Sequence, residues 1–567
     1  YEALYDTWQD LERTMLSFTV RHRPADWFTH RLNIGRDYTR EQDVELMHHD
    51  ERWMDLNSFA DRGYKQMWDR STEYTSVDYS GTFQFPVTVD LESSTSVGGQ
   101  LYRRDAGFVY AYGEGFPVPG LTSMRATTQN RVNDEYRVEN VTVGAYIQQQ
   151  LSWQNRLFFT AAVRADDNSA FGQEFDLVTY PKVSGSWVIS EEPFWNLGQV
   201  STLKLRAAYG ESGQQPDAFV ALQTFNPSPG PGGAGTVTPA NLGNPRLGPE
   251  RGSEIEAGFD AGLFDDRVTL EFTYYNQRTK DAILRREIAP STGFSGLQYV
   301  NAGEIRNSGL ELLIRGDAWR TDRHGLELGF NIGTNENEVV SLGDITDENY
   351  MSVGSYNRHQ IGYPVSAWFG RKLVSAELDG DGNAINVMCE GASGSPVACD
   401  DAPEVYLGRV TPKMQGGFNA TLRLFDRFRL FGQLDFKTGF HKLDGNMRVR
   451  CVFYVMCEEN WFPERFDPVR VAGVQGGYVD AMVDEADFMK LREVSLAYDV
   501  PANWAGRLGA SGATISLAGR NLATWSDFSG LEPESSFNAG SRGGSILWEQ
   551  SVLPQLHQFV ATINVTF

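Results

Sequence analysis

The feature that most constrains this fold is a two-residue alternation of apolar and polar side chains along segments of about ten residues. Segment 268–275 places apolar groups at every second position: Val268, Leu270, Phe272 and Tyr274. Successive side chains of a strand point to opposite faces, so one face can contact lipid while the other carries Glu271. Segment 427–437 places polar groups on its second face: Arg427, Arg429, Gln433 and Asp435. We therefore expect Glu271 and these four residues to face a lumen.

About 17 to 18 segments of this kind are recognisable, each close to the length of a tilted membrane-spanning strand. The sequence therefore predicts an all-β fold, a large antiparallel transmembrane β-barrel that occupies residues 1–567. Between about residues 339 and 403 the alternation does not assign strands that complete an up-and-down order. A soluble all-β carbohydrate-active enzyme is a weaker alternative, because these strands lack a second apolar face.

Composition agrees with a barrel and argues against other classes. The mean hydropathy of −0.39 would ordinarily indicate a soluble protein, but a barrel strand shows lipid only every second residue. The net charge of −24 would repel a phosphate backbone, so we expect no nucleic-acid partner. We expect no catalytic residues, because no Ser/His/Asp or Cys/His arrangement can be argued from residue order alone.

Short and long connections alternate along the chain, as they do in barrels with periplasmic turns and extracellular loops. Phe425-Asp426 is a tight turn, and the segments 214–250, 440–487 and 524–550 are expected to be extracellular loops. Large aromatic residues in the loops can stack on sugar rings, anchor a partner or pack the loops internally. These residues are Trp461, Phe462, Phe466, Tyr478 and Trp525.

The four cysteines form two close pairs, Cys389 with Cys399 and Cys451 with Cys457, each in a polar stretch. Local disulfides that close two loops are the preferred interpretation, and they suit an oxidising compartment outside the inner membrane. Metal binding is the lesser alternative, because neither pair has CxxC spacing or a nearby histidine.

Three further patterns admit a site and a simpler interpretation. Asp379, Asp381, Asn383 and Glu390 match positions one, three, five and twelve of a calcium loop, although a polar turn is the stronger interpretation. No other cofactor is expected. The run 48–51 (His-His-Asp-Glu) offers metal ligands but is better explained as a solvated loop. The run 230–235 satisfies G-x-G-x-x-G without a surrounding βαβ unit, so we expect a loop.

Several motifs resemble the TonB-dependent outer-membrane receptors of the SusC/RagA type. Segment 244–250 (NPRLGPE) resembles that family's lead into a barrel strand, with Pro249 where the family usually has Trp. Segments 274–281, 290–294 and 301–311 follow the family's order and spacing. Near the end, 491–498 (LREVSLAY), 519–525 (GRNLATW) and 530–534 (GLEPE) resemble its last hairpins and final loop.

The resemblance implies a location in the bacterial outer membrane and about 22 strands in the complete protein. It also implies a signal peptide, a TonB box and a plug domain, all of which we expect to lie outside this sequence. The expected partners are outer-membrane lipids, TonB and a SusD-like surface lipoprotein, with a glycan or a peptide as substrate. The resulting hypothesis is import of a bulky polar nutrient, and the alternative is a structural or adhesive barrel without transport.

Overall fold

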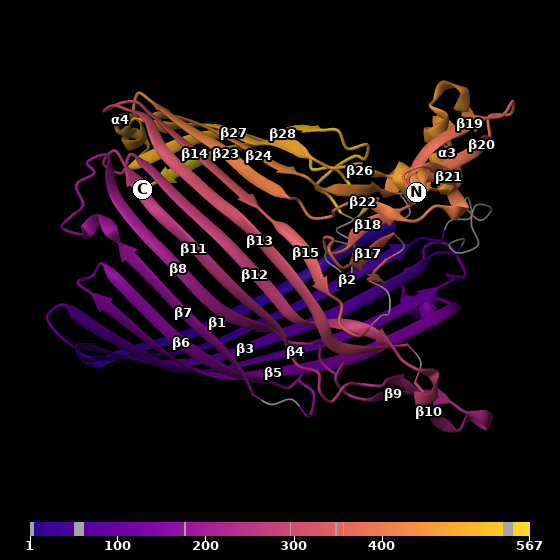
Figure 1. The fold of residues 1–567 in the computed structure, drawn as a ribbon, viewed down its shortest axis with the longest axis horizontal. Coiled ribbons are helices and arrows are strands. Elements are labelled where there is room, and N and C mark those ends of the chain that lie inside the picture. Colours follow the sequence, from indigo (N-terminus) through magenta and orange to yellow (C-terminus); the bar gives the residue numbers. More distant parts are fainter. Residues whose placement is uncertain are drawn as a thin grey trace. The chain divides into compact units, whose positions relative to one another are not determined.

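The computed structural model describes residues 5–49, 62–174, 177–294, 296–345, 349–354, 356–536, 548–550 and 552–567. Within these residues, eighteen strands join in one sheet, and neighbouring strands such as β1 and β2, β2 and β3, and β23 and β24 run antiparallel (Figure 1). The segments with two-residue alternation thus form strands. The eighteen strands of this sheet agree with the 17 to 18 segments recognised in the sequence.

The sheet uses nearly every alternating segment of the chain. Its first eight strands are β1 Tyr5–Ala25, β2 Phe28–Met47, β3 Tyr64–Pro86, β4 Leu91–Glu114, β5 Gln129–Trp153, β6 Leu157–Asn168, β7 Val178–Val188 and β8 Val200–Gln214. The other ten are β11 Glu250–Leu263, β12 Val268–Glu287, β13 Leu297–Arg320, β14 Gly325–Thr334, β15 Glu336–Ser341, β23 Met414–Leu424, β24 Phe428–Thr438, β27 Phe488–Val500, β28 Gly512–Ser526 and β30 Gln558–Thr566.

The chain divides into two compact units. Unit 1 contains residues 1–185, 210–251 and 283–301, and unit 2 contains residues 186–209, 252–282 and 302–567. The first five strands belong to unit 1 and are 20 to 25 residues long, about twice the expected length.

Cross-strand ion pairs join the long first strands of unit 1. Arg36 pairs with Glu73 at 2.9 Å and Arg40 pairs with Asp69 at 2.7 Å, both between β2 and β3. Charges opposite one another stabilise paired strands even where an apolar stripe is interrupted. The long hairpins of unit 1 therefore continue through charged positions that a hydrophobic pattern does not mark.

Tight turns join the strands at one end of the sheet in unit 2. Phe425 and Asp426, between β23 and β24, have φ angles of 56° and 58°. Two consecutive residues with positive φ are typical of the type I′ turn, whose twist matches that of the strands it joins. The tight turn expected at this position is confirmed.

The segment that could not be assigned from the sequence forms small sheets outside the eighteen strands. One sheet contains β16 Tyr350–Ser352, β17 Asn357–Gln360, β18 Ala367–Gly370 and β22 Val405–Gly408. A second contains β19 Leu373–Leu378, β20 Ala384–Glu390 and β21 Pro396–Ala398. These strands add nothing to the up-and-down order, which is why that order did not close between residues 339 and 403.

The long connections of unit 2 contain their own buried core. Trp368, Leu443, Val474 and Met482 are fully buried in one cluster that joins residues of the 339–410 and 440–487 segments. Phe440, Phe488 and Phe528 form another cluster at the start of β27. We call the residues 350–410 and 440–487 the loop subdomain. Apolar packing is thus concentrated in the connections of this unit.

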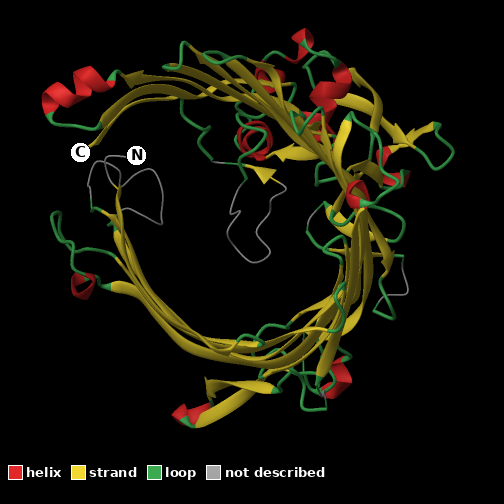
Figure 2. Ribbon diagram, turned by 90° about the vertical axis from the view of Figure 1, so that its left-hand side faces the viewer, coloured by secondary structure: helices red, strands yellow, loops and turns green. Residues whose placement is uncertain are grey.

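Helices are short and occur in the connections between strands (Figure 2). The loop subdomain contains α1 Gly445–Met447, α2 Glu458–Trp461 and α3 Pro468–Gly476, while α4 Ala502–Ala505 follows β27. The remaining short strands are β9 Thr224–Pro229, β10 Gly235–Asn241, β25 His441–Asp444, β26 Val483–Glu485 and β29 Trp548–Glu549. Among the described residues, no helix combines the length and the hydropathy needed to cross a bilayer.

Candidate functional site

One face of the sheet in unit 2 is polar and hollowed. A cavity of about 600 Å³ lies on it, and Glu271, Thr273 and Asp435 are among its lining residues. Arg206 donates from Nη2 to Thr273 Oγ1 at 2.6 Å and from Nε to Asp260 Oδ1 at 3.1 Å. The lining also includes Arg206, Glu256, Glu271, Glu311, Asn331, Gln415 and Lys437. Two of the five residues expected to face a lumen therefore share this polar face.

The alternate positions of the same strands carry exposed apolar side chains. Ile255 of β11, Tyr274 of β12 and Leu430 of β24 are each about half exposed, although all three are hydrophobic or aromatic. An extended apolar surface of this kind is costly in water and is typical of a face that contacts lipid. The alternation therefore separates a polar face from an apolar one.

The remaining candidate lumen residues lie in or just before β24. Arg427 and Arg429 line a different cavity, of about 570 Å³, beside the turn residue Asp426. Gln433 pairs across the sheet with Glu493, whose carboxylate accepts from Arg520 Nε at 3.0 Å. The five residues are thus distributed along the strands and do not form one site.

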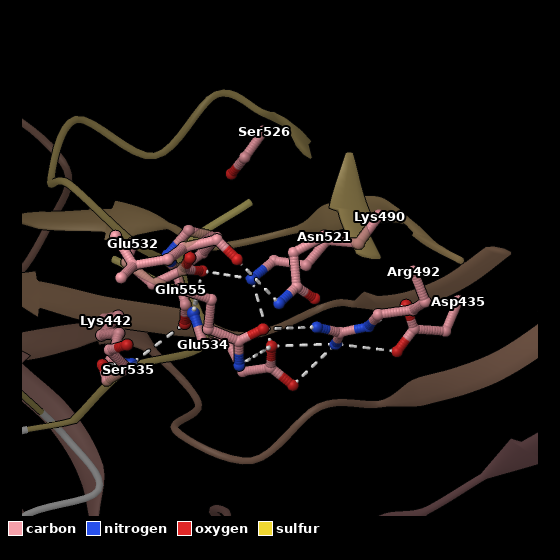
Figure 3. A network of polar contacts seen from close by, with 12 residues as sticks. Asp435, Lys442, Lys490, Arg492, Asn521, Ser526, Glu532, Glu534, Ser535 and Gln555 are labelled. Carbon is pink, nitrogen blue, oxygen red and sulfur yellow. Dashed lines mark hydrogen bonds and ion pairs between the residues drawn. The ribbon is translucent and has the colours of Figure 1, made fainter. Parts of the chain in front are cut away.

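A buried ion-pair network holds the segment 527–536 against the polar face of unit 2 (Figure 3). Lys490 of β27 is 2% exposed, and its Nζ lies 2.5 Å from Glu532 Oε1 and 3.1 Å from Glu534 Oε2. Glu532 is 4% exposed. Charges removed from water in this way are stable only when they are paired and hydrogen-bonded.

Arg492 extends the network from the segment to the neighbouring strand. Its Nε and Nη2 donate to the two carboxylate oxygens of Asp435 at 2.6 and 2.9 Å, and Nη2 also lies 2.8 Å from both oxygens of Glu534. Gln555 accepts from Arg492 Nη1 at 3.0 Å and donates to Glu534 Oε2 at 3.2 Å. Planar guanidinium and carboxylate groups paired twice fix orientation as well as distance. The network therefore joins β24, β27, the segment 527–536 and Gln555.

Lys442 of β25 adds a third contact from the loop subdomain. This 3% exposed lysine donates from Nζ to the backbone carbonyls of Pro533, at 2.9 Å, and Ser535. Burial lowers the pKa of Lys442 to about 8, although Glu549, Glu532 and Glu534 oppose the shift. Burial also raises the pKa of Glu549, with the negative charge of Asp444 adding to the effect.

The sequence contained part of the signal for this network. The run 530–534 supplies Glu532 and Glu534, but it was noticed only for its resemblance to a family motif. Lys490 was missed, and Arg492 was noted only within segment 491–498, because a basic residue on a strand ordinarily indicates a solvated face. The available signal was a matched spacing: Glu532 and Glu534 are two residues apart in a loop, and Lys490 and Arg492 are two residues apart on a strand.

Both expected disulfides are present. Cys389 is bonded to Cys399 and Cys451 to Cys457, and all four residues are buried in clusters of the loop subdomain. Loops of this length are stabilised by about 2 to 3 kcal/mol in the chain-entropy description. The disulfides therefore support the local cores of the connections.

The polar turn that the sequence favoured at residues 379–383 is present, and Glu390, the twelfth position of the weaker calcium alternative, lies apart from it. Asp379 Oδ1 accepts from the backbone amides of Asp381, at 2.9 Å, and Asn383, at 2.8 Å, which closes a polar turn. Glu390 lies at the other end of the β19–β20 hairpin, where Leu373 pairs with Cys389. It pairs instead with Lys372 at 3.4 Å. The turn thus uses the Asp379 carboxylate that a cation would need.

The other minor motifs have structural roles among the described residues. His48 Nε2 lies 2.7 Å from Asp6 Oδ2, and His49 Nδ1 lies 2.7 Å from the Phe116 carbonyl oxygen, so these imidazoles diverge. Asp50 and Glu51 lie outside the described residues. The glycine-rich run 230–235 forms the connection of the β9–β10 hairpin, as expected of a loop.

Comparison with known proteins identifies the architecture. Residues 1–391 match the family model described as TonB dependent receptor-like, beta-barrel. The chain is 28% identical over 502 residues to TonB-dependent receptor P26 of Formosa agariphila, covering 79% of this chain and 49% of that protein. It is 25% identical over 434 residues to TonB-dependent receptor SusC of Bacteroides thetaiotaomicron, covering 71% of this chain and 42% of SusC.

A solved structure supports the same fold. The RagAB peptide importer in its open-open state superposes with a TM-score of 0.84 at 17% identity, covering 100% of this chain and 62% of that chain. The chain spans about half the length of the curated relatives it matches. The prediction of a large antiparallel β-barrel and the resemblance to the SusC/RagA type are confirmed.

We expect Lys490→Met to release the segment 527–536, because the substitution leaves Glu532 buried without its cation, at a cost of about 3 to 5 kcal/mol. Hydrogen exchange of the backbone amides in this segment should accelerate accordingly. Arg520→Gln is the matched control, because the pair with Glu493 is exposed and contributes less than about 1 kcal/mol. Equal exchange in Lys490→Met and the parent protein would contradict a role for the network in docking.

We expect docking of the segment to strengthen as the pH rises from about 8 toward 10.5. The pKa of Lys442 is about 8 in the folded state and 10.5 in the unfolded state, so the unfolded state binds more protons across this window. Amide exchange in the segment should therefore slow with pH, after correction for intrinsic rates. Lys442→Met should remove this increment, and an unchanged pH dependence in that variant would reject the assignment to Lys442.

Proposed function

Because the chain belongs to the TonB dependent receptor-like β-barrel family, we propose that it forms the barrel of an importer for a bulky polar nutrient, a glycan or a peptide. The protein is located in the bacterial outer membrane, as are the receptors of this family. Transport is driven by energy that TonB delivers through a plug domain, and a SusD-like lipoprotein assists at the cell surface.

The polar face of unit 2 is the observation that carries this proposal. It presents carboxylates, amides and guanidinium groups to one cavity, while the opposite positions of the same strands are apolar. A polar solute exchanges its hydration for contacts with such groups at a small cost, whereas an apolar wall would exclude it. We assign Glu271, Arg427, Arg429, Gln433 and Asp435 to the wall of the passage.

The segment 527–536 is attached at several points on the polar face. Its carboxylates pair with Lys490 and Arg492 of β27, and its backbone carbonyls accept from Lys442 of β25. Each of its anchoring carboxylates has at least one charged partner. The segment and the side chains around it therefore contribute to selectivity for large solutes in this proposal.

An exposed apolar tip on the loop subdomain supports a protein partner. Residues 453–456 (Phe-Tyr-Val-Met) are all exposed within the loop that the Cys451–Cys457 disulfide closes, and Trp461 is 71% exposed beside them. Trp461 Nε1 donates to the Val455 carbonyl at 2.9 Å, so the tip is organised before any partner arrives. Exposed aromatic groups held in place are typical anchors of protein interfaces. We assign this tip to the SusD-like lipoprotein.

We expect cells that express the full-length protein with its lipoprotein to accumulate a fluorescently labelled glycan or peptide from the native growth medium. An uncoupler of the proton gradient should abolish accumulation, because energy reaches the receptor through TonB. Deletion of the receptor gene is the control for other entry routes. Accumulation that persists with the uncoupler would contradict TonB-driven import, and surface retention without entry would favour the adhesive alternative.

We expect Trp461→Glu to weaken co-purification of the lipoprotein with the receptor about tenfold or more, because a charge replaces a central aromatic anchor. Trp504→Glu is the matched control. Trp504 is also exposed, at 56%, but it lies on α4, in the connection between the end of β27 and the start of β28. Equal recovery of the lipoprotein with both variants would reject the apolar tip as its contact.

A further inference from the structure

Unit 1 contains a polar cavity that the preceding account of the passage does not use. It measures about 420 Å³ and lies against β5, β6, β7 and β8. Its lining combines two tyrosine rings with carboxylate, amide and guanidinium groups. These lining residues include Tyr146, Arg164, Asp166, Tyr180, Glu211 and Gly213.

Two glycines allow large side chains to lie flat on the sheet at this cavity. A Cβ at Gly144 of β5 would lie 1.9 Å from Asp166 Oδ1 and 2.5 Å from Arg164 Nη2. A Cβ at Gly213 of β8 would lie 1.9 Å from the hydroxyl oxygen of Tyr180. Any other residue at either position would displace these groups. The Arg164–Asp166 pair therefore packs against the backbone of Gly144, and the Tyr180 ring packs against the backbone of Gly213.

Three of the four charged residues that line the cavity have an ion-pair partner. Arg164 Nε donates to both carboxylate oxygens of Asp166 at 2.8 Å, and Arg164 Nη2 donates to Gln100 Oε1 at 2.9 Å. Glu211 lies 3.3 Å from Arg251 Nη2. The charged residues that line the cavity, Arg164, Lys182, Asp166 and Glu211, balance as two cations and two anions. Such a site favours an uncharged ligand over one that needs a counter-charge.

The backbone around the cavity is committed to the sheet. Tyr146 pairs with Arg164 and Gly144 pairs with Asp166 in an uninterrupted β5–β6 register. An extended peptide is commonly recognised by adding a strand to a free sheet edge, which the face of a paired sheet does not offer. A ligand here must be read by side chains alone. Tyr180, whose hydroxyl has no hydrogen-bond partner among the described residues, is available for that contact.

We propose that this cavity binds one ring of a neutral saccharide, a subsite that rests on the proposed import function and assigns a glycan as its substrate class. The apolar C–H face of a sugar ring packs on Tyr146 and Tyr180, and its hydroxyls both donate and accept. The carboxylates of Asp166 and Glu211 accept from these hydroxyls, while the Arg164 guanidinium and the free Tyr180 hydroxyl donate. A few convergent polar groups beside aromatic rings are typical of small-molecule sites.

The test is saturation-transfer NMR on the full-length receptor in detergent, with a mixture of glucose, galactose, mannose, xylose, maltose, cellobiose and the peptide trialanine as the probe. We expect saturation transfer from the parent protein to at least one sugar, and about tenfold weaker binding in Tyr180→Ala and in Gly144→Leu, which displaces the Arg164–Asp166 pair. Tyr180→Phe should retain most of the binding, because it keeps the ring. Tyr79→Ala is the control, because Tyr79 is an exposed tyrosine of β3 that does not line the cavity.

Absence of transfer from the parent protein to all six sugars would overturn the proposal. Equal binding by Tyr180→Ala and the parent protein, both with the same heat-modifiable gel mobility, would also overturn it, as would transfer to trialanine in place of the sugars. Because binding is measured at equilibrium without TonB, its outcome is separate from that of import. A receptor that binds sugar here but fails the uptake assay would support the subsite and reject import. Uptake without binding at this cavity would support import and reject the subsite.

Discussion

The rest of the structure depends on one constraint, which is that backbone amides and carbonyls in a bilayer must find their hydrogen bonds within the protein. The eighteen-stranded sheet satisfies these groups strand by strand, as the continuous pairing of β2 with β3 shows. Once the backbone is paired, side chains are left to distinguish the two faces. Polar groups collect on one face and apolar groups on the other, and the connections must obtain stability from other interactions.

The connections between strands are stabilised by a buried apolar core and by buried ion pairs. Trp368 and Met482 lie in a core that disulfides reinforce, and Lys490 and Glu532 are hidden from water only because they meet one another. Such a pair contributes orientation more than net stability, since desolvation offsets much of the attraction. The same reasoning explains why Arg492 contacts both Asp435 and Glu534, because the guanidinium compensates two carboxylates that would otherwise repel each other.

Sequence reasoning recovered the fold wherever a two-residue period was uninterrupted. Leu270 and Glu271 lie on opposite faces as their alternation required, and the cysteine pairs followed from their spacing. It failed where a contact joins distant segments. Lys490 meets Glu532 across 42 residues of sequence, and no local pattern encodes that meeting. Spacing alone also did not reveal that a hairpin carries Glu390 away from Asp379, although the favoured polar turn at residues 379–383 is present.

The separate core of the loop subdomain has an evolutionary consequence. Residues such as Val474 and Leu443 pack against one another and against a disulfide, so their environment is set by the connections themselves. Substitutions there need not preserve the period of the strands, and substitutions in the strands need not preserve that core. The loop subdomain can therefore change its sequence while the paired strands keep theirs, and the strands can change while that core is preserved.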